Sequence, residues 1–188
     1  VLSGFVETLQ TLTLEPEEEQ RYLALMAQQA LRMQNVVNGL LTLSRLEGSP
    51  LPSLSEWTPV APLLKACEDE ARALSALLSP PSQQHRLEFP ALSGLGDIAG
   101  VPAELQSALS NLVANAVRYT PTSGTITVAW TRQADGSAVF AVADTGPGID
   151  PAHIARLTER FYRVDRSRSR DTGGTGLALA IVKHVLQR

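Results

Sequence analysis

Residues 166–186 read RSRSRDTGGTGLALAIVKHVL, an arginine-rich segment that passes through closely spaced glycines into an apolar helical pattern. Gly173, Gly174 and Gly176 indicate a backbone that bends sharply or that lets a ligand come close. A helix over residues 174–187 would present unpaired backbone N–H groups at its start, which is a favourable place for an anion. The sequence therefore predicts a phosphate-binding loop here, and the rest of the chain must indicate which kind.

Two common phosphate motifs do not describe this loop. The chain contains no G-x-x-x-x-G-K-[ST] pattern, so it has no P-loop. The string GTGLAL (174–179) begins like a dinucleotide-binding fingerprint but lacks the third glycine. It also follows an arginine-rich segment rather than a strand, which argues against a Rossmann site.

The overall composition is typical of a globular protein, with 44% hydrophobic and 19% charged residues among 188. The formal net charge of -3 argues against general binding to nucleic acid or to a membrane surface. The single cysteine, Cys67, excludes an intrachain disulfide and fits a reducing, cytoplasmic setting. No apolar run reaches transmembrane length, and Val1 begins in mid-pattern, so we expect a fragment of a longer protein.

Residues 1–48 show the pattern of an antiparallel helical hairpin. Residues 1–13 form one apolar helix face, and LEPEEEQ then breaks the helix and starts another. The second helix carries an unbroken apolar seam, formed by Leu23, Met26, Ala30, Met33, Val37 and Leu40. Such a seam is typical of a four-helix bundle in a dimer; a hairpin that packs on its own second domain is the alternative.

Residues 49–58 are rich in Pro and Ser and indicate a linker. Over residues 59–188, helical segments mix with short strands, and QADG between two alternating runs signals a hairpin. We expect an α+β fold, in which helices cover one face of a sheet of antiparallel strands. The expected helices are 60–78, 102–119 and 174–187, and the expected strands are 85–89, 96–100, 124–132 and 137–144.

A second segment with candidate binding residues is NLVANAVRYT (111–120). Its polar side chains are spaced i, i+4, i+7 and i+8, which places them on one helix face: Asn111, Asn115, Arg118 and Tyr119. Two amides, a cation and an aromatic ring on one face can hold a metal-bound phosphate with a ribose or a base. A plain polar face is the alternative, but asparagine is a poor helix former and an unfavourable filler.

A third segment, VADTGPGID (142–150), ends an apolar strand with Asp144 and continues with Gly146 and Gly148. A carboxylate at a strand end can accept a hydrogen bond from an exocyclic amine. The glycines beside it let a planar base lie against the backbone. A simple turn with Asp as turn former is the alternative.

The fourth segment, TERFYRVDRSRSR (158–170), places Phe161 and Tyr162 among arginines. Its length and its glycine-rich flanks suit a lid over a ligand. A nucleic-acid patch is the competing interpretation, which the net charge disfavours.

Together and in this order, the four segments resemble the N, G1, F and G2 boxes of the ATP-binding domain of bacterial sensor histidine kinases, within the wider gyrase, Hsp90, kinase and MutL ATPase superfamily. Residues 1–48 resemble the dimerisation and histidine phosphotransfer domain of that family, and residues 59–188 resemble its ATP-binding catalytic domain, an α/β sandwich. The strings TERFYRVDRSRS and GGTGLALAIVKH look most like the phosphate-regulon sensor kinases.

The resemblance implies roles for the residues of the first helix face. Asn115 would bind Mg²⁺, and Asn111 would lie beside it in the phosphate site. Arg118, where the family usually has Lys, and Tyr119 would contact the phosphates and the base region. Hydrolysing relatives carry a water-activating glutamate near position 111, and an amide cannot act as a general base, so transfer to a side chain is expected rather than hydrolysis.

The resemblance also implies roles for the glycine-rich segments. Asp144 would bind the adenine amine in a pocket shaped by Gly146 and Gly148. The lid and the phosphate loop would contribute Phe161, Arg163, Gly174, Gly176 and Leu177. The implied catalytic set is Asn111, Asn115, Arg118 and Arg163.

The resemblance implies an activity and partners. The chain would bind ATP with Mg²⁺, transfer the γ-phosphoryl group to a histidine of a dimeric hairpin, and pass it to an aspartate in the receiver domain of a response regulator. The expected location is the cytoplasmic side of a protein anchored in the bacterial inner membrane, with no nucleic-acid partner.

The chain departs from the family in its acceptor motif. The phosphoacceptor histidine of the family lies in a motif like H-E-L-R-T-P, which is absent here. His85, His153 and His184 stand in other contexts and are expected at the surface or in loops. We therefore expect that this chain does not phosphorylate itself at the family's site.

Two further departures concern the phosphate loop and the end of the chain. Ala178 replaces a family glycine, which weakens ATP binding if positive φ is needed and costs nothing if the residue is helical. A final strand pair usual in the family is expected to be missing, which would leave a sheet edge open. The alternative function is therefore a non-catalytic, ATP-binding dimer or scaffold.

Overall fold

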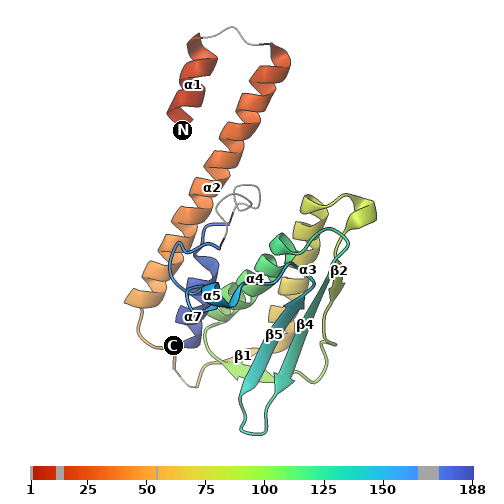
Figure 1. Ribbon diagram of the computed structural model, residues 1–188. Helices are drawn as coiled ribbons and strands as arrows, with labels where there is room; N and C mark the ends of the chain where they lie inside the picture. The colour runs from red at the N-terminus through yellow and green to blue at the C-terminus, as the bar shows by residue number, and fades with distance from the viewer. Residues whose placement is uncertain (1, 12–14, 54, 165–173) are drawn as a thin grey trace.

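A computed structural model describes residues 2–11, 15–53, 55–164 and 174–188 as a long hairpin beside a mixed α/β unit (Figure 1). The helices are α1 (Leu2–Thr11), α2 (Pro16–Gly48), α3 (Val60–Leu78), α4 (Pro102–Tyr119), α5 (Pro151–Ile154) and α7 (Ala178–Leu186), with a 3₁₀ turn, η1 (Pro81–Gln83). The strands are β1 (Trp57–Pro59), β2 (Arg86–Glu88), β3 (Asp97–Ala99), β4 (Thr125–Arg132) and β5 (Ala138–Asp144).

The hairpin forms as the sequence predicts, with α1 folded back along the upper part of α2 (Figure 1). Pro16 occupies the first turn of α2, where its missing N–H is not needed, and three glutamates follow at the positive end of the helix dipole. The rings of Phe5 and Tyr22 pack with their centroids 5.8 Å apart and join the two helices near the tip.

The predicted seam of α2 remains at the surface over most of its length. Its members Leu23, Met33, Val37 and Leu40 are between 39% and 52% exposed. The lower end of α2 differs, because Leu43 and Leu46 are buried against the α/β unit. α2 therefore exposes an apolar stripe along most of its length and buries its C-terminal end against the α/β unit.

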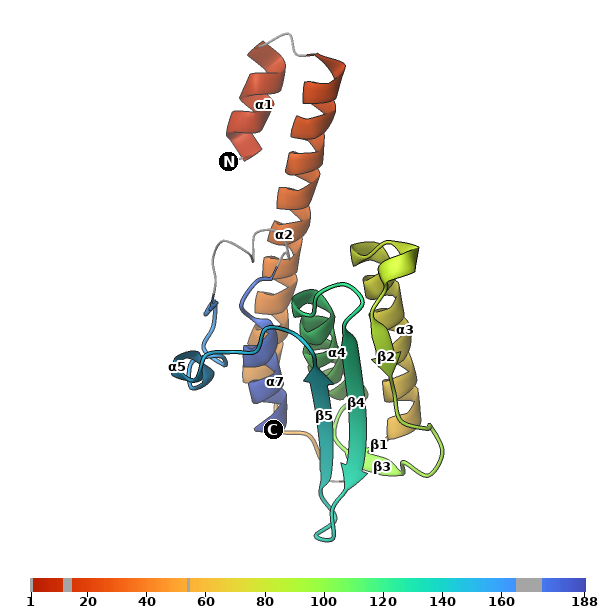
Figure 2. The ribbon, with the colours of Figure 1, turned by 45° about the vertical axis from the view of Figure 1, so that its right-hand side comes forward.

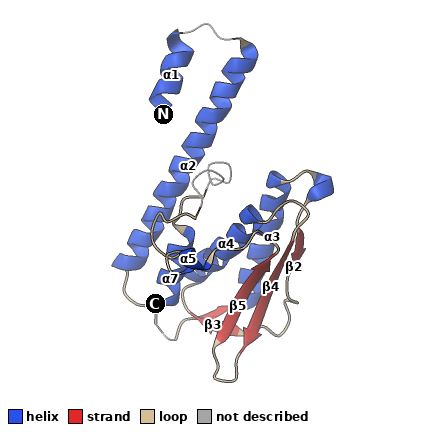
Figure 3. Cartoon of the chain, viewed as in Figure 1, coloured by secondary structure: helices blue, strands red, loops and turns tan. Residues whose placement is uncertain are grey.

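The main sheet has the strand order β2-β4-β5 (Figure 3). β4 and β5 form the predicted antiparallel hairpin, whose register pairs Ile126 with Asp144 and Arg132 with Ala138. The expectation of purely antiparallel strands is wrong for β2, which runs parallel to β4. A parallel pair needs a crossover, and here the connection from β2 to β4 passes through β3 and α4.

A second, two-stranded sheet pairs β1 with β3, placing Thr58 opposite Ile98. The prediction that Trp57 and Thr58 belong to the linker is wrong, because both residues lie in this strand. The Thr58 hydroxyl also donates a hydrogen bond of 2.6 Å to the Gly100 carbonyl. The last two residues of the predicted linker, Trp57 and Thr58, are therefore fixed to the α/β unit.

The core confirms an α+β sandwich with helices on one sheet face. Ile126 and Val128 of β4 are buried against α3 and α4, whereas the alternate residues Thr127 and Ala129 are exposed. The buried side chains of this cluster are Leu63, Cys67, Ala71, Leu109, Val113, Ala116, Val117, Ile126 and Val128. Figure 2 shows α3 and α4 side by side behind the strands.

A second hydrophobic cluster joins the hairpin to the α/β unit. Its buried members come from α2, α4, α7 and the residue before α7: Leu43, Leu46, Ala108, Leu177, Ala180, Ile181, Val182 and Val185. Glu47, at the end of α2, also forms an ion pair with Arg160 and lies 3.5 Å from the His184 ring. The two predicted parts of the chain therefore share one core at their junction.

His85 lies in the loop before β2, as one half of the expectation has it, but it is buried rather than at the surface, with only 8% of the residue exposed. Its Nε2 lies 3.0 Å from the Thr120 carbonyl, so this nitrogen must carry the donated hydrogen. Its Nδ1 lies 2.8 Å from the Ser75 hydroxyl, which also accepts the backbone N–H of His85. The imidazole thus ties α3 to the end of α4.

Ser75→Ala is expected to lower the free energy of unfolding by about 1–3 kcal/mol, because it leaves two buried groups of His85 unpaired. Urea denaturation measures this change. Ser79→Ala is the matched control: Ser79 is 5% exposed, and its hydroxyl has no hydrogen-bond partner within the described residues. Equal losses in both variants would contradict the assigned role of the Ser75–His85 pair.

Candidate functional site

The predicted polar face of α4 forms as expected. Val113 and Val117 are 1% exposed and face the sheet, whereas Asn111, Asn115 and Arg118 are only partly buried. The Asn111 amide donates a hydrogen bond of 2.8 Å to the Ser107 carbonyl, so its nitrogen is held against the helix and its oxygen remains an acceptor. Arg118 lies in the last turn, where a cation is favoured by the helix dipole.

Tyr119 brings three of the predicted segments together. A Cβ atom placed on Gly146 would lie 3.1 Å from the Tyr119 carbonyl oxygen and 2.6 Å from Asp144 Oδ1. A Cβ atom on Gly174 would lie 3.1 Å from the Tyr119 hydroxyl. The end of α4, the turn after β5 and the loop before α7 therefore meet around one residue, and the two glycines leave room where a side chain would intrude.

Asp144 is the last residue of β5 and is exposed. Its Oδ1 accepts the backbone N–H of Gly146 at 2.8 Å, which fixes the carboxylate over the turn. A carboxylate has further lone pairs and can still accept from an amine. Gly148 has φ +72° and an exposed backbone, which suits the close approach of a flat ligand. Sequence reasoning missed Thr145, whose hydroxyl accepts the Thr125 N–H at 3.0 Å and anchors this turn.

Phe161 and Gly176 form a close backbone contact. The Phe161 N–H donates to the Gly176 carbonyl at 2.8 Å. Gly176 has φ +72°, and a Cβ atom there would lie 2.8 Å from the Phe161 carbonyl carbon. Glycine is thus required at this position by both backbone angle and space. Phe161 itself has φ +62°, an uncommon conformation for a non-glycine residue.

The predicted lid is described in its first part, up to Val164. Residues 165–173, which include Gly173 and the arginines after Val164, lie outside the described part of the chain. Within that part, Phe161 is 54% exposed and Arg163 is partly buried. The lid and the reach of Arg163 toward a terminal phosphate therefore stay predictions.

The predicted helix over 174–187 is wrong at its start, because α7 begins at Ala178 and the glycines precede it in a loop. The Leu177 N–H is bonded to the Thr175 hydroxyl at 3.3 Å. The Leu177 side chain is 1% exposed and packs in the shared cluster against Gly39, so only the backbone of this residue could face a ligand. Ala178 is helical, and alanine is favourable there.

The side chains near the predicted site suit a metal ion that binds together with the phosphates of a nucleotide. Within the described ranges, no three His, Cys, Asp or Glu side chains gather in a way that could hold a metal ion. Burial raises the pKa of the Cys67 thiol, so this residue stays protonated and is no metal ligand. Mg²⁺ takes oxygen ligands and keeps substrate phosphates and waters in its shell, so the partly buried amide oxygen of Asn115 fits as a protein ligand.

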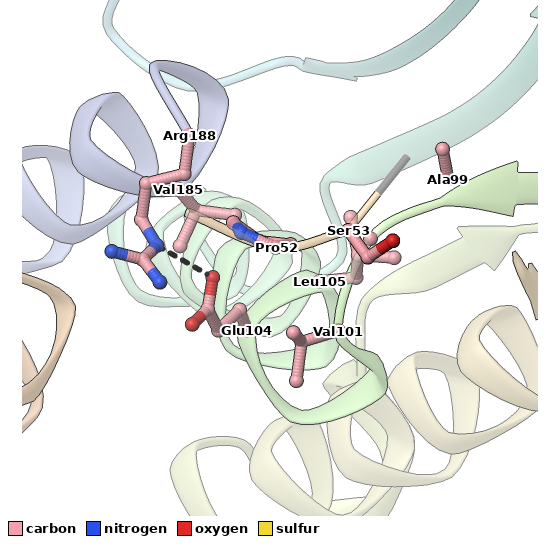
Figure 4. A pocket seen from close by; sticks show the side chains of 9 residues that line it. Pro52, Ser53, Ala99, Val101, Glu104, Leu105, Val185 and Arg188 are labelled. Carbon is pink, nitrogen blue, oxygen red and sulfur yellow. Dashed lines mark hydrogen bonds and ion pairs between the residues drawn. The ribbon is translucent and has the colours of Figure 1, made fainter. Parts of the chain in front are cut away.

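A small pocket of about 70 Å³ lies away from these residues, between the linker, β3, α4 and the end of α7 (Figure 4). It is too small for a nucleotide, since ligand pockets usually measure about 300–1,000 Å³. Arg188 lines one side of this pocket. Its Nε forms an ion pair with Oε2 of Glu104 at 2.9 Å. The same guanidinium donates to the carbonyls of Pro50 at 2.8 Å and Ser49 at 3.0 Å, and also to that of Leu46.

Arg188→Ala is expected to lower the free energy of unfolding by about 1.5–3 kcal/mol, because these bonds involve a charged group in a shielded place. Amide hydrogen exchange of residues 49–53 should also become faster. Arg72→Ala is the control, since Arg72 pairs with Glu68 on the surface of α3 with 57% of its side chain exposed. Its removal should cost less than about 1 kcal/mol. Equal effects would contradict the clamping role of Arg188.

None of the helices in the described ranges is long and apolar enough to span a bilayer. Comparison with protein families gives two matches. The family described as "Histidine kinase-, DNA gyrase B-, and HSP90-like ATPase" matches residues 100–188, and the family described as "His Kinase A (phospho-acceptor) domain" matches residues 1–49. These ranges contain the predicted nucleotide segments and the hairpin, respectively.

Similar curated proteins include two phosphate regulon sensor proteins. PhoR of Pseudomonas aeruginosa is 47% identical over 193 residues, covering 100% of this chain and 41% of that protein. PhoR of Haemophilus influenzae is 34% identical over 186 residues, covering 99% of this chain and 42% of that protein. The chain thus spans less than half the length of these relatives.

Solved structures show the same architecture. Full-length ShkA, solved in complex with AMPPNP, has a TM-score of 0.66 and 27% identity, with 97% of this chain and 36% of that chain covered. The histidine kinase AdeS of Acinetobacter baumannii has a TM-score of 0.63 and 20% identity, with 99% and 81% covered, and supports the fold alone.

Proposed function

Because this chain belongs to the two-component sensor histidine kinases and resembles the phosphate-regulon sensors, we propose that its α/β unit binds Mg-ATP and transfers the γ-phosphoryl group to a histidine of the hairpin domain. From there the group passes to an aspartate of a response regulator. The proposal concerns the kinase core of a longer protein.

The observation that carries the proposal is the meeting of three segments around Tyr119. The carboxylate of Asp144 lies at one side, next to Gly146, and the loop with Gly174 lies at the other, beside the Tyr119 hydroxyl. This arrangement supports a base bound at Asp144 and phosphates bound between α4 and the start of α7. The free N–H groups at the start of α7 favour anionic oxygens.

The roles of the residues follow from their chemistry. A Mg²⁺ ion bound with the nucleotide neutralises phosphate charge during transfer. Asn115 offers an amide oxygen for that ion, and the positive charge of Arg118 lies one turn further along α4. Asn111 has no carboxylate that could activate a water molecule. Transfer of the phosphoryl group to a side chain is therefore favoured over hydrolysis of ATP.

The hairpin supports a dimer in this proposal. The exposed seam residues of α2 form an apolar stripe that a second copy of the hairpin can cover, which is the usual construction of a four-helix bundle. Dimerisation and a response-regulator partner are general for the family. Anchoring of the whole protein in the inner membrane, with this part on the cytoplasmic side, completes the proposal.

Phosphorylation in trans tests the kinase function. The chain is mixed with radiolabelled Mg-ATP and with a hairpin-bearing partner from a close relative that has an intact acceptor histidine but a disabled ATP site. Label transferred to the partner supports the kinase proposal. ATP binding without any label on the partner would favour the non-catalytic scaffold instead.

A further inference from the structure

The residues that follow Gly148, as far as Tyr162, form a short helix and a series of turns. Asp150 caps α5 by accepting the Ala152 N–H on Oδ1 at 2.9 Å. Successive turns continue after α5, with i to i−3 backbone bonds from Arg156, Leu157, Glu159 and Tyr162. Residues 150–160 therefore form a short, compact segment next to the predicted nucleotide site, and we call this segment the support.

The Tyr162 side chain is held by two contacts with this support. Its hydroxyl lies 2.6 Å from His153 Nδ1. The guanidinium of Arg156 lies over its ring, 4.1 Å from the centroid, in cation–π geometry. Arg156 is in turn held by Glu159, at 3.0 Å between Nη2 and Oε2, and this hydrogen bond raises its pKa. The Tyr162 side chain thus has little freedom.

Phe161 connects this support to the phosphate loop. Its left-handed backbone is strained and persists only where the surroundings impose it. On one side its N–H is bonded to the Gly176 carbonyl at 2.8 Å, and on the other side the fixed ring of Tyr162 follows directly in the chain. Because Gly176 packs against Phe161 backbone atoms, a shift of Phe161 must also shift the Gly176 loop.

We propose that Tyr162 and His153 are positioning residues for nucleotide binding, which hold Phe161 and, through it, the Gly176 loop in the geometry that accepts phosphates. This inference rests on the proposed function, since it assigns the phosphates to that loop. The two residues act on the nucleotide through the backbone.

A purely structural role makes a different prediction. If the Tyr162–His153 bond only stabilised the fold, its loss would lower the melting temperature and weaken all ligands together. A positioning role affects the phosphates selectively. The affinity for ATP should fall, whereas the affinity for adenosine, which has no phosphate, should stay unchanged.

The test uses Tyr162→Phe and His153→Leu, with Tyr22→Phe as a matched control that removes a tyrosine hydroxyl from the hairpin. Calorimetry measures Mg-ATP affinity, NMR titration measures adenosine affinity, and thermal unfolding measures stability. Each test variant should weaken ATP binding by about three- to tenfold, the usual effect of one lost hydrogen bond. His153→Asn, which keeps a polar group near Nδ1, should restore part of the affinity.

A double variant should bind ATP no more weakly than either single variant, because both lose the same bond. Wild-type ATP affinity in Tyr162→Phe, or equal losses for ATP and adenosine, would overturn the positioning role while leaving the proposed function intact. Absence of ATP binding by the unmodified chain would overturn the proposed function and this inference with it.

Discussion

Asn115→Ala should abolish most Mg²⁺-dependent ATP binding while leaving the chain folded. Asn115 lies partly buried on the accessible face of α4, opposite the valines that pack on the sheet, so its side chain can be shortened without opening the core. As the proposed ligand of the ion, Asn115 should matter at least as much as the groups that orient ligands, whose loss costs up to about 100-fold in metal affinity. Titration calorimetry with Mg²⁺ measures the loss.

The same titration in EDTA provides an internal control, because wild type and variant should then bind the nucleotide equally weakly. Asn35→Ala, an exposed asparagine of α2, controls for the substitution itself. Unchanged binding by Asn115→Ala in the presence of Mg²⁺ would remove Asn115 from the site. A parallel loss in Asn35→Ala would point to the hairpin instead.

Gly176→Ala should lower the free energy of unfolding by about 2 kcal/mol or more and also abolish ATP binding. The added methyl group meets backbone atoms of Phe161 and the Tyr162 carbonyl oxygen within 3.0 Å, and backbone cannot rotate aside like a side chain. The φ of +72° adds strain for any residue with a Cβ.

Gly136→Ala separates the two causes. Gly136 has φ +86° in the β4–β5 turn, but no atom lies within 4 Å of the position of its Cβ. This variant should show only the strain, about 1 kcal/mol, and normal ATP binding. Urea denaturation and calorimetry on both variants give the comparison. Identical stabilities would mean that the Phe161 contact yields to the methyl group.

Local signals in the sequence predicted the long elements. α4 could be predicted because Pro102 and Glu104 mark its start, and the β4–β5 hairpin because QADG separates two alternating runs. β1 was missed because three residues within a Pro- and Ser-rich stretch become a strand only through their partner β3, which lies 40 residues away in the pairing of Thr58 with Ile98. The direction of β2 likewise depends on the crossover and not on its own residues.

The candidate site was predictable in its parts and not in its assembly. Glycines and asparagines with unusual spacing identified the segments, since both residue types are unfavourable without a specific role. The contacts of these segments around Tyr119 arise from the tertiary structure, and the spacing of residues in the sequence does not predict them. For Leu177, the neighbouring glycines indicated a binding residue, whereas its side chain belongs to the core. The Tyr162–His153 bond joins residues that no pattern linked.

The attachment of α2 has a mechanical consequence. With 33 residues, this helix is a rod about 50 Å long, because an α-helix rises 1.5 Å per residue. Within the described residues, the α/β unit contacts this helix near one end, through Gly39, Leu43, Leu46 and Glu47. The free arm from Gly39 to Pro16 is about 35 Å long, so a tilt of about 10° at these contacts moves the far end of the helix through about 6 Å. The position of the hairpin tip relative to the α/β unit is thus governed by a few contacts near the other end of α2.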